Sequence, residues 1–440
     1  MNILIIGQGV TGKSVLNFYK KYHPEYNLYI YDSRNINKNQ KITHNHYKHN
    51  KIDLELELIF NNTIQINDII LSPGIYPKDA KVLKIINSCK KNNPKLCIKS
   101  EIDLFLEYAH KDSKIIAITG SNGKSSVCKT LFNILKYCNK KVLLGGNYGP
   151  AAISLLTENN YFEKPSIDFY ILELSSFQLE QTNNFKSHIS CLLNISPDHL
   201  DYHGDITKYI HAKLKIFNNC DYQIYPDINN PNQYIKSNLK SNLNNLNNLN
   251  NLNNLNNLNN LNTDIKANIN ALLKITETLN IPKATCLQII SQTTPLPHRY
   301  EVISKKNNVY WINDSKATNI HATIAALKKS KNTCENQIIL ILGGEPKQQN
   351  FKLLLGFLQQ QKINIRAICI IGKNKIIKNK LSNLFDNYYK VYIHNNLDDA
   401  VKLCCQNAQK GDHVLLSPAC SSLDEYPNFE HRGEHFSKLL

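Results

Sequence analysis

Short apolar runs alternate with longer amphipathic stretches along most of this 440-residue chain. The runs at residues 2–6, 114–118 and 337–342 are too short for helices and consist mostly of Ile and Leu, which is typical of strands buried on both faces of a sheet. Stretches with helical spacing and no helix breaker, such as residues 127–137, separate these runs. Because predicted strands alternate with predicted helices, the pattern indicates an α/β fold with parallel sheets.

A glycine-rich loop at residues 119–126, Thr-Gly-Ser-Asn-Gly-Lys-Ser-Ser, joins the predicted strand at 114–118 to the predicted helix at 127–137. A loop in this position directs backbone N–H groups at an anion, and the helix N-terminus adds positive potential. Lys124 can reach the β- and γ-phosphates of a nucleotide, and the Ser125 hydroxyl can bind Mg²⁺. We therefore predict an ATP site, with an ordinary glycine-rich turn as the alternative.

A second glycine-rich loop, Gly-Gln-Gly-Val-Thr-Gly at residues 7–12, follows the first predicted strand. Asp32 ends the next strand at about the spacing of a dinucleotide-binding fingerprint. A nicotinamide-dependent dehydrogenase is therefore one hypothesis, but the loop indicates only a phosphate-bearing ligand, and a UDP-sugar would fit equally. A simple strand-end cap is the alternative role for Asp32. Residues 72–74 end another predicted strand and are expected at the ligand-binding edge of the same sheet.

Polar residues also stand at the ends of two strands predicted near the phosphate loop. Glu173 is in the last residues of the strand at 168–174, and His199 follows the strand at 189–194. A carboxylate and an imidazole at this edge could hold a metal ion near the γ-phosphate. As a single residue, His199 is equally well explained as a cap or a surface histidine.

The helix predicted at residues 209–217 carries Lys213 and Lys215. Residues two positions apart cannot share a helix face, so at most one of the two lysines points inward. From the residues alone, the expectation for Lys213 is a solvated surface lysine.

The rest of the chain contains a biased segment and a third α/β unit. Residues 238–262 are largely Asn-Asn-Leu triplets, a period that fits neither strand nor helix, so we predict a low-complexity segment off the reaction path. A helix is predicted at 265–279, and residues 295–301, with His298 and Arg299, are predicted to form an extended linker at a domain joint. Parallel strands are predicted beyond this linker, starting at residue 309 and continuing at 337–342, 367–371 and 413–416.

Composition and charge narrow the function less than the motifs do. The formal net charge is +17, but the basic residues are not gathered in one stripe with aromatic residues between them, so we predict anionic substrates and no nucleic-acid partner. Twelve cysteines without a CxxC pair argue against a zinc site and a disulfide framework and favour a reducing cytosol. The chain opens on a strand-like run and holds no apolar run of membrane-spanning length, so we expect a soluble cytoplasmic protein without a membrane partner. We also expect a monomer.

Two phosphate loops and a third unit with polar strand ends suggest ATP-driven ligation. Longer motifs run in order over nearly the whole chain, namely TGSNGKSS, GGN, LELSSFQLE, NISPDHLDYH, YIHAKLKIF, PLPHRYE, NDSKATN and SPACSSLDEYPNFEHRG. With these motifs the chain resembles the Mur ligase family, and NDSKATN and the last motif resemble the members that add D-glutamate.

The resemblance implies three α/β domains. A Rossmann-like domain at residues 1–104 would bind UDP-MurNAc-L-alanine. A P-loop ATPase-like central domain at 105–294, with the insert at 238–262, would bind ATP. A Rossmann-like C-terminal domain at 295–440 would bind D-glutamate and close on ATP.

The resemblance also implies the reaction, which is a step of peptidoglycan precursor synthesis. The alanine carboxylate of UDP-MurNAc-L-alanine attacks the γ-phosphate of ATP, giving an acyl phosphate and ADP. The amine of D-glutamate then attacks the acyl carbon and expels phosphate. Two Mg²⁺ ions, Lys124, Arg299 and Lys316 would neutralise the converging anions. A non-catalytic nucleotide-binding member of the family is the alternative.

The resemblance assigns residues to each ligand. The expected ATP contacts are Gly120, Ser121, Asn122, Gly123, Lys124, Ser125, Ser126, Asn270, Arg299, Asp314, Lys316 and Thr318. The expected contacts of the UDP-linked substrate are Val10, Thr11, Gly12, Asp32, Ser33, Arg34, Gly74 and Asn147. The expected D-glutamate contacts are Lys347, Ser422, Leu423 and Phe429. The expected catalytic residues are Lys124, His199, Lys213, His298 and Lys316, and the expected metal ligands are Ser125, Glu173, His199 and a carbamylated Lys213.

The chain departs from the family pattern in three places. The interval between the Lys213 helix and the Asn270 helix normally holds further strands, and here it holds the Asn-Leu tract. Asn268 lies one residue away from the expected spacing of the family's His-Asn pair. The loop around Lys347 lacks a glycine that the family usually has beside this lysine.

Overall fold

A computed structural model describes residues 1–32, 64–75, 79–157, 167–225 and 263–440, with the side chains from residue 266 in the last range. These residues divide into two compact units. The first unit holds two parallel sheets, and the second holds a third sheet together with residues 195–209. Ser33 and Arg34 and the predicted insert at 238–262 lie outside the described residues.

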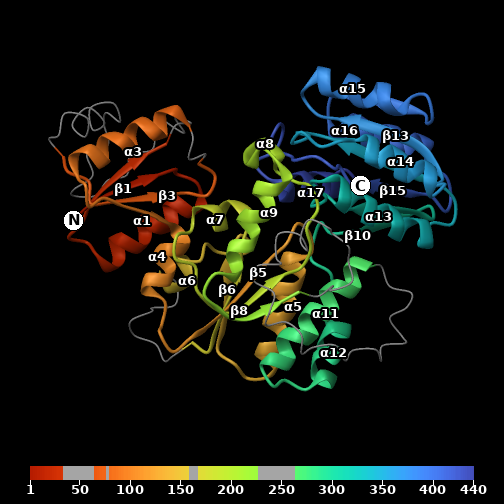
Figure 1. The fold of residues 1–440 in the computed structure, drawn as a ribbon. Coiled ribbons are helices and arrows are strands. Elements are labelled where there is room, and N and C mark those ends of the chain that lie inside the picture. The colour runs from red at the N-terminus through yellow and green to blue at the C-terminus, as the bar shows by residue number, and fades with distance from the viewer. Residues whose placement is uncertain (33–63, 76–78, 158–166, 226–262) are drawn as a thin grey trace. The chain divides into compact units, whose positions relative to one another are not determined.

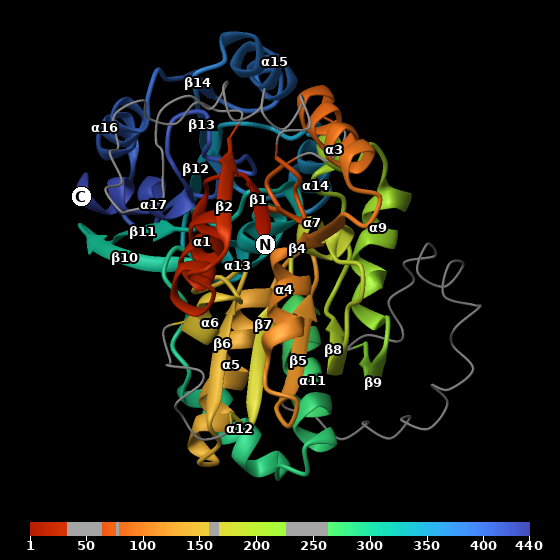
Figure 2. The same ribbon diagram turned by 90° about the vertical axis from the view of Figure 1, so that its left-hand side faces the viewer.

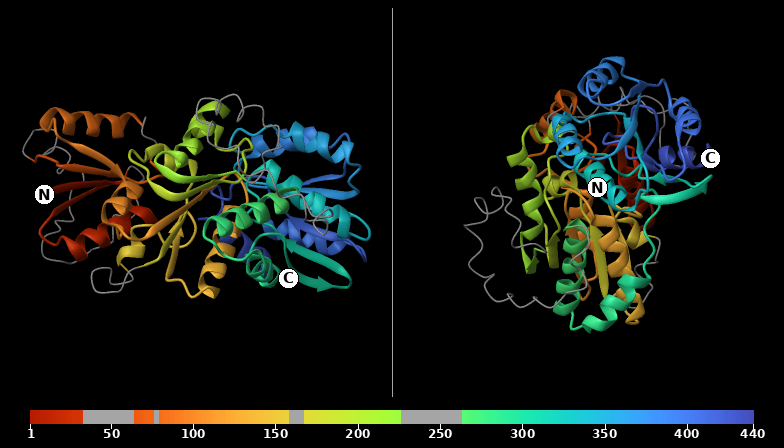
Figure 3. Two further views of the ribbon diagram at one scale, coloured as in Figure 1. Left: turned by 60° about the horizontal axis from the view of Figure 1, so that its bottom comes forward. Right: turned by 90° about the vertical axis from the view of Figure 1, so that its right-hand side faces the viewer.

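The first sheet contains four parallel strands in the order β2-β1-β3-β4. Its strands are β1 (Asn2–Ile6), β2 (Asn27–Tyr31), β3 (Asp68–Leu71) and β4 (Cys97–Ser100). Its helices are α1 (Val10–Tyr22), α3 (Ala80–Asn92) and α4 (Glu101–Tyr108). Alternate residues of β1 enter separate apolar clusters, one with α1 and one with α3, so these helices cover opposite faces of the sheet (Figures 1 and 3).

The second sheet contains five parallel strands in the order β6-β7-β5-β8-β9. Its strands are β5 (Lys114–Thr119), β6 (Val142–Gly146), β7 (Phe169–Glu173), β8 (Ser187–Leu192) and β9 (Cys220–Ile224). The helices of this part of the chain are α5 (Lys124–Tyr137), α6 (Ser154–Thr157), α7 (Ser176–Gln181), α8 (Leu200–His203), α9 (Ile206–Leu214), the 3₁₀ turn η1 (Lys215–Phe217), α11 (Thr263–Thr278) and α12 (Lys283–Gln292). Helix α5 packs along β5, β6 and β7 (Figure 2), which fixes the phosphate loop at the carboxyl end of the central strand.

The third sheet contains six strands in the order β10-β11-β15-β12-β13-β14. Its strands are β10 (Glu301–Lys306), β11 (Val309–Asn313), β12 (Ile338–Gly343), β13 (Ile365–Ile371), β14 (Val391–Ile393) and β15 (His413–Leu416). Its helices are α13 (Ile320–Thr333), α14 (Lys352–Gln360), α15 (Lys375–Phe385), α16 (Leu397–Asn407) and α17 (Phe429–Lys438). Residues of β12 alternate between a cluster with α13, α14 and α15 and a cluster with α16 and α17, so both faces are buried and the strand reads as a continuous apolar run.

Two expectations for the third sheet and the segment before it are wrong. The sheet is not wholly parallel, because β10 pairs antiparallel with β11. Asn307 and Asn308, both with positive φ, form the two-residue hairpin turn between them, which asparagine tolerates better than most residues. The segment at 295–301 is not an extended linker either, because His298 (φ 60°) and Tyr300 (φ 48°) are left-handed and turn the chain into β10.

The α/β class and the parallel first and second sheets agree with the prediction. Among the described residues, no helix combines the length and the apolar character needed to cross a membrane.

Candidate active site

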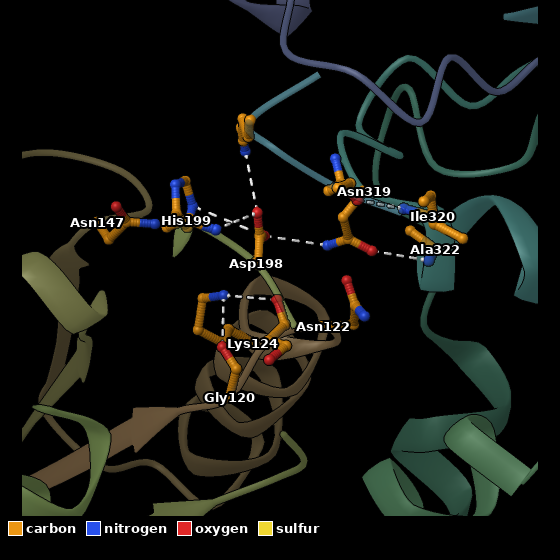
Figure 4. Close-up of polar contacts among 12 residues, drawn as sticks. Gly120, Asn122, Lys124, Asn147, Asp198, His199, Asn319, Ile320 and Ala322 are labelled. Atoms are coloured by element: carbon orange, nitrogen blue, oxygen red, sulfur yellow. Dashed lines mark hydrogen bonds and ion pairs between the residues drawn. The ribbon is translucent and has the colours of Figure 1, made fainter. Parts of the chain in front are cut away.

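The phosphate loop lies between β5 and α5, as predicted, but the helix begins at Lys124 rather than at residue 127. Gly123 caps the helix with a φ of 84°, a left-handed conformation that favours glycine. The Lys124 ammonium group turns back over the loop and donates to the carbonyl oxygens of Gly120 (2.8 Å) and Ser121 (3.0 Å; Figure 4). Ser125, in the first turn of the helix, is 2% exposed.

Asn194 supports this loop, and the sequence analysis did not single it out as a site residue. Its carbonyl oxygen accepts from the Ser121 N–H at 3.0 Å. Its side-chain amide exchanges two hydrogen bonds with the backbone of Asn122, at 2.9 and 3.1 Å. The sequence feature that could have identified it is its position just after β8, the strand next to β5 in the sheet.

Glu173 and Asn147 meet at the same edge of the second sheet. The Asn147 side-chain amide donates to Glu173 Oε1 at 2.7 Å, and the Asn147 N–H donates to the Glu173 carbonyl oxygen at 2.8 Å. Gly146 precedes Asn147, and a Cβ atom there would stand 2.3 Å from that carbonyl oxygen, so only glycine fits. Glu173 is 1% exposed, and its Oε2 is buried without a hydrogen-bond partner in the described part of the chain. A carboxylate oxygen that is buried without a hydrogen-bond donor is a suitable ligand for a cation, and Mg²⁺ prefers oxygen ligands of this kind.

Lys213 is buried and lies against the phosphate loop. It is 2% exposed, and its amine donates to the Gly120 carbonyl oxygen at 2.9 Å and the Thr119 hydroxyl at 3.4 Å. Lys215 instead reaches the Glu180 carbonyl oxygen in an exposed contact. The prediction that only one of the two lysines points inward is confirmed, and the expectation of a solvated Lys213 is wrong.

Asn268 on α11 contacts the phosphate loop from another element. A Cβ atom on Gly123 would stand 2.5 Å from Asn268 Oδ1, and this oxygen is buried without a hydrogen-bond partner in the described residues. Asn270, the residue that the sequence analysis chose on this helix, is partly exposed. Asn268 therefore covers the loop although it does not fit the family spacing.

The first glycine loop is braced by Asp32. This residue is 5% exposed, and its carboxylate accepts from the Gln8 N–H at 2.6 Å, so it supports the loop as a strand-end residue. A Cβ atom on Gly12 would stand 1.8 Å from the Gly7 carbonyl oxygen, which explains the glycine there. Val10 is 73% exposed, Thr11 is partly exposed, and Gly74 has open space beside it.

In the second unit, Asp314 follows β11 and is buried. Its two carboxylate oxygens accept from the Tyr300 N–H (2.9 Å) and the Ser417 hydroxyl (2.8 Å). Burial raises the pKa of Asp314 to about 7, although these hydrogen bonds and the nearby charge of Arg299 act in the opposite direction. Thr318 lies four residues further along, just before α13.

His298 and Lys316 lie close to the start of α17. Asn313 contacts the His298 imidazole at 3.0 Å, and the Lys316 N–H donates to the His298 carbonyl oxygen at 3.1 Å. A Cβ atom on Gly433 would stand 2.3 Å from the His298 ring, so this glycine makes room for it. The Lys316 ammonium group lies 3.8 Å from the centre of the Phe429 ring, a cation–π contact.

Asp198 links several predicted residues of the second unit, and the sequence analysis gave it no role. Its carboxylate contacts the Lys347 ammonium group at 3.4 Å. It also contacts the Asn319 side-chain amide at 3.1 Å and the His199 imidazole at 3.6 Å (Figure 4). The side chains of Asp198 and Lys347 are 7% and 11% exposed. Ser422 is buried and Leu423 is 69% exposed. The signal for Asp198 was its place directly before His199.

The predicted residues thus form three groups, one at the glycine loop after β1 and one around the phosphate loop, both in the first unit, and one at the carboxyl edge of the third sheet in the second unit. A phosphate loop between the central strand of a parallel sheet and a helix places the chain in the class of α/β enzymes built around such a loop. The chain belongs to the Mur ligase family. Residues 118–280 match the model of the Mur ligase middle domain, and residues 298–420 match that of the Mur ligase glutamate ligase domain.

Curated relatives that match this chain over nearly their whole length share one name. A UDP-N-acetylmuramoylalanine--D-glutamate ligase of Buchnera aphidicola subsp. Baizongia pistaciae is 35% identical over 460 residues, covering 100% of this chain and 97% of the relative. The ligase of the same name from Vibrio cholerae is 27% identical, with the same coverage.

Solved structures share the fold. The UDP-N-acetylmuramate-alanine ligase MurC of Thermotoga maritima is 14% identical with a TM-score of 0.57, covering 100% of this chain and 98% of that one. The MurF ligase of the same organism, solved in complex with ADP, is 13% identical with a TM-score of 0.56, covering 86% and 96%.

Proposed function

We propose that this chain is an ATP-dependent ligase that joins D-glutamate to UDP-MurNAc-L-alanine through an acyl phosphate. The proposal is supported by relatives of that name over the full chain. The observation that carries the chemistry is the phosphate loop with buried Glu173 and Lys213 in the same unit. These groups suit the binding of a nucleotide and a cation.

We assign the three sheets to three domains, at residues 1–104, 105–294 and 295–440. The first domain would bind the UDP-linked substrate at the glycine loop after β1, where α1 offers its N-terminus to a diphosphate. The central domain would bind ATP. The third domain would bind D-glutamate near Lys347, Ser422 and Phe429 and would contact ATP through Asp314 and Lys316.

Lys124 and the loop N–H groups bind and orient the terminal phosphates in this proposal. On ATP binding, the Lys124 ammonium group exchanges the carbonyl oxygens that it contacts now for phosphate oxygens, which are better partners for a cation. Ser125 and Glu173 would hold Mg²⁺ together with His199, and the ion would stabilise charge that develops on the transferred phosphoryl group. Asn147 keeps one oxygen of Glu173 fixed while the other is left for the ion.

Lys213 is proposed to react with CO₂. The neutral amine is the form that attacks CO₂, which gives a carbamate and releases one proton. The carbamate nitrogen keeps one N–H, which can still donate to the Gly120 carbonyl oxygen. The change replaces a cation beside the phosphate loop by an anionic oxygen ligand. A Lys213→Ala variant is expected to lose at least about 100-fold in kcat, and acetate or formate in the assay is expected to restore part of it.

The function is tested by phosphate release from ATP with purified full-length chain, UDP-MurNAc-L-alanine, Mg²⁺ and bicarbonate. D-glutamate, L-glutamate and L-alanine are supplied in parallel, and we expect release with D-glutamate alone. ATP binding without release under any condition would favour the non-catalytic alternative. Release driven by another amino acid would overturn the assignment of the acceptor.

A further inference from the structure

The side chain of Gln349 joins three loops at the carboxyl edge of the third sheet. Its Oε1 accepts from the Ile320 N–H at 2.8 Å, and its amide nitrogen donates to the carbonyl oxygens of Pro346 (3.0 Å) and Ala419 (2.9 Å). These three partners follow β11, β12 and β15, which are neighbours in the order β11-β15-β12. One carboxamide therefore bridges the ends of three adjacent strands.

Each bridged loop carries residues of the proposed amino-acid site or ATP site. Ile320 directly follows Thr318 and Asn319, and Asn319 donates to Asp198. Pro346 precedes Lys347, which pairs with the same Asp198 carboxylate. Gln349 and Asp198 thus close a ring of contacts through the Asn319 loop and the Lys347 loop, and all its members belong to the second unit.

The Lys347 loop needs such support because its backbone is strained. Lys347 (φ 50°) and Gln348 (φ 56°) are consecutive left-handed residues, and neither is glycine. A conformation of this kind persists only where surrounding contacts fix it. Gln349 directly follows the strained pair and donates to the carbonyl oxygen of Pro346, which directly precedes the pair, and to that of Ala419 in a separate loop.

We propose that Gln349 is a positioning residue that sets the location of the Lys347 ammonium group for binding the acceptor amino acid. The proposal rests on the proposed function, because it takes D-glutamate as the ligand of Lys347. Gln349 does not touch the substrate in this proposal. It acts through the backbone on both sides of the lysine.

The test compares Gln349→Met, which keeps the length of the side chain and removes its hydrogen bonds, with wild type and with Gln360→Met, an exposed control at the end of α14. In Gln349→Met the KM for D-glutamate is expected to rise about tenfold, because a small displacement of the Lys347 ammonium group weakens its contact with the ligand. The KM for the UDP-linked substrate is expected to stay unchanged. A loss of kcat with every KM unchanged would indicate only a smaller folded fraction and would overturn the proposal.

A second variant separates hydrogen bonding from bulk. Gln349→Glu keeps an acceptor for the Ile320 N–H but turns a carboxylate towards two carbonyl oxygens. At pH 7 to 8 an ordinary glutamate is ionised and cannot donate to either carbonyl oxygen, so the KM for D-glutamate of this variant is expected to exceed the wild-type value. A KM for this variant that equals the wild-type value would refute the proposal.

Hydrogen exchange gives a readout that does not require activity. The Ile320 amide and the 345–350 peptide are expected to exchange faster in Gln349→Met than in wild type and in Gln360→Met. If wild type released no phosphate with D-glutamate, the proposed function would fail, and this exchange measurement would still decide the positioning role. Unchanged exchange at both places would exclude it.

Discussion

Glu101 offers a test of how burial controls a charge in the first unit. It occupies the first turn of α4 and is 1% exposed. Its Oε1 accepts from the Ile153 N–H at 2.6 Å, and its Oε2 is buried without a hydrogen-bond partner in the described residues. Burial raises the pKa of Glu101 from 4.5 to about 7, against the opposing effect of the Ile153 and Ala152 N–H groups. The folded protein therefore holds a proton on this carboxyl at pH values where the unfolded chain has released it.

The sign of the effect on stability follows from this difference in proton binding. Between pH 4.5 and pH 7 the folded state binds more protons at Glu101 than the unfolded state, so the contribution of this residue to stability falls as the pH rises. The full shift corresponds to about 3 kcal/mol, and most of this is lost between pH 5 and pH 8. Below the unfolded-state pKa the penalty is absent.

The variant Glu101→Gln keeps the acceptor for Ile153 and cannot ionise. Its free energy of unfolding relative to wild type is expected to rise by about 2 to 3 kcal/mol from pH 5 to pH 8, so the variant becomes relatively more stable. The comparison between two pH values cancels the pH-independent cost of placing an amide N–H₂ group beside the buried site. Urea unfolding of the full chain at both pH values, monitored by hydrogen exchange of residues 101–108, measures this difference.

A matched control is Glu277→Gln, which changes an exposed glutamate on α11 in the same unit. Its stability relative to wild type is expected to be the same at both pH values. If Glu101→Gln also showed the same difference at pH 5 and pH 8, the Glu101 carboxyl would not titrate near neutrality, and the reasoning from its burial would be refuted.

Three further substitutions test the geometry of the two groups of site residues. Asn268→Asp would place a negative charge against Gly123, so the KM for ATP is expected to rise about tenfold. Asn268→Ala, which adds no charge, is expected to cause a smaller rise, and equal effects of the two variants in steady-state assays would contradict an electrostatic cause. Gln348→Gly should raise the free energy of unfolding by about 1 kcal/mol, because glycine adopts the left-handed backbone without strain, and a urea midpoint at or below wild type would count against this. Asp198→Asn should lower the free energy of unfolding by about 2 kcal/mol, because it leaves the largely buried Lys347 ammonium group without its ion pair. Adding Lys347→Met should recover part of this loss, and no recovery in the double variant would rule out the ion pair as its source.

The sequence predicted the parts of the site that depend on chain order. The β5 loop and Glu173 lie at strand ends, and short apolar runs followed by glycine or polar residues mark such ends clearly. The pairing register then places Ile118 opposite Glu173 and Thr119 opposite Leu192, so these residues share one edge of the sheet. This much follows from a parallel fold without knowledge of any side-chain contact.

The sequence did not predict contacts that depend on packing between distant elements. Helical spacing predicted that at most one of the two lysines near the end of α9 points inward. It could not predict that Lys213 would contact Gly120, 93 positions away in the sequence. Spacing favoured Asn270 on α11, whereas the rotation of this helix against the phosphate loop brings Asn268 onto Gly123. The antiparallel β10 was missed because its polar, exposed sequence lacks the apolar run by which the other strands were recognised.

Strand ends carry the chemistry in this fold because they are where buried polar groups can be supported at low cost. In the second sheet, Asn194 satisfies backbone groups of the phosphate loop, and Asn147 satisfies one oxygen of Glu173. In the third sheet, Gln349 does the same for three loops. Each is a carboxamide, which donates and accepts without adding charge, so the charged groups beside it stay available for anions and cations. Carboxamides next to strand ends therefore mark the supporting residues of such a site, although of these three only Asn147 was named from the sequence.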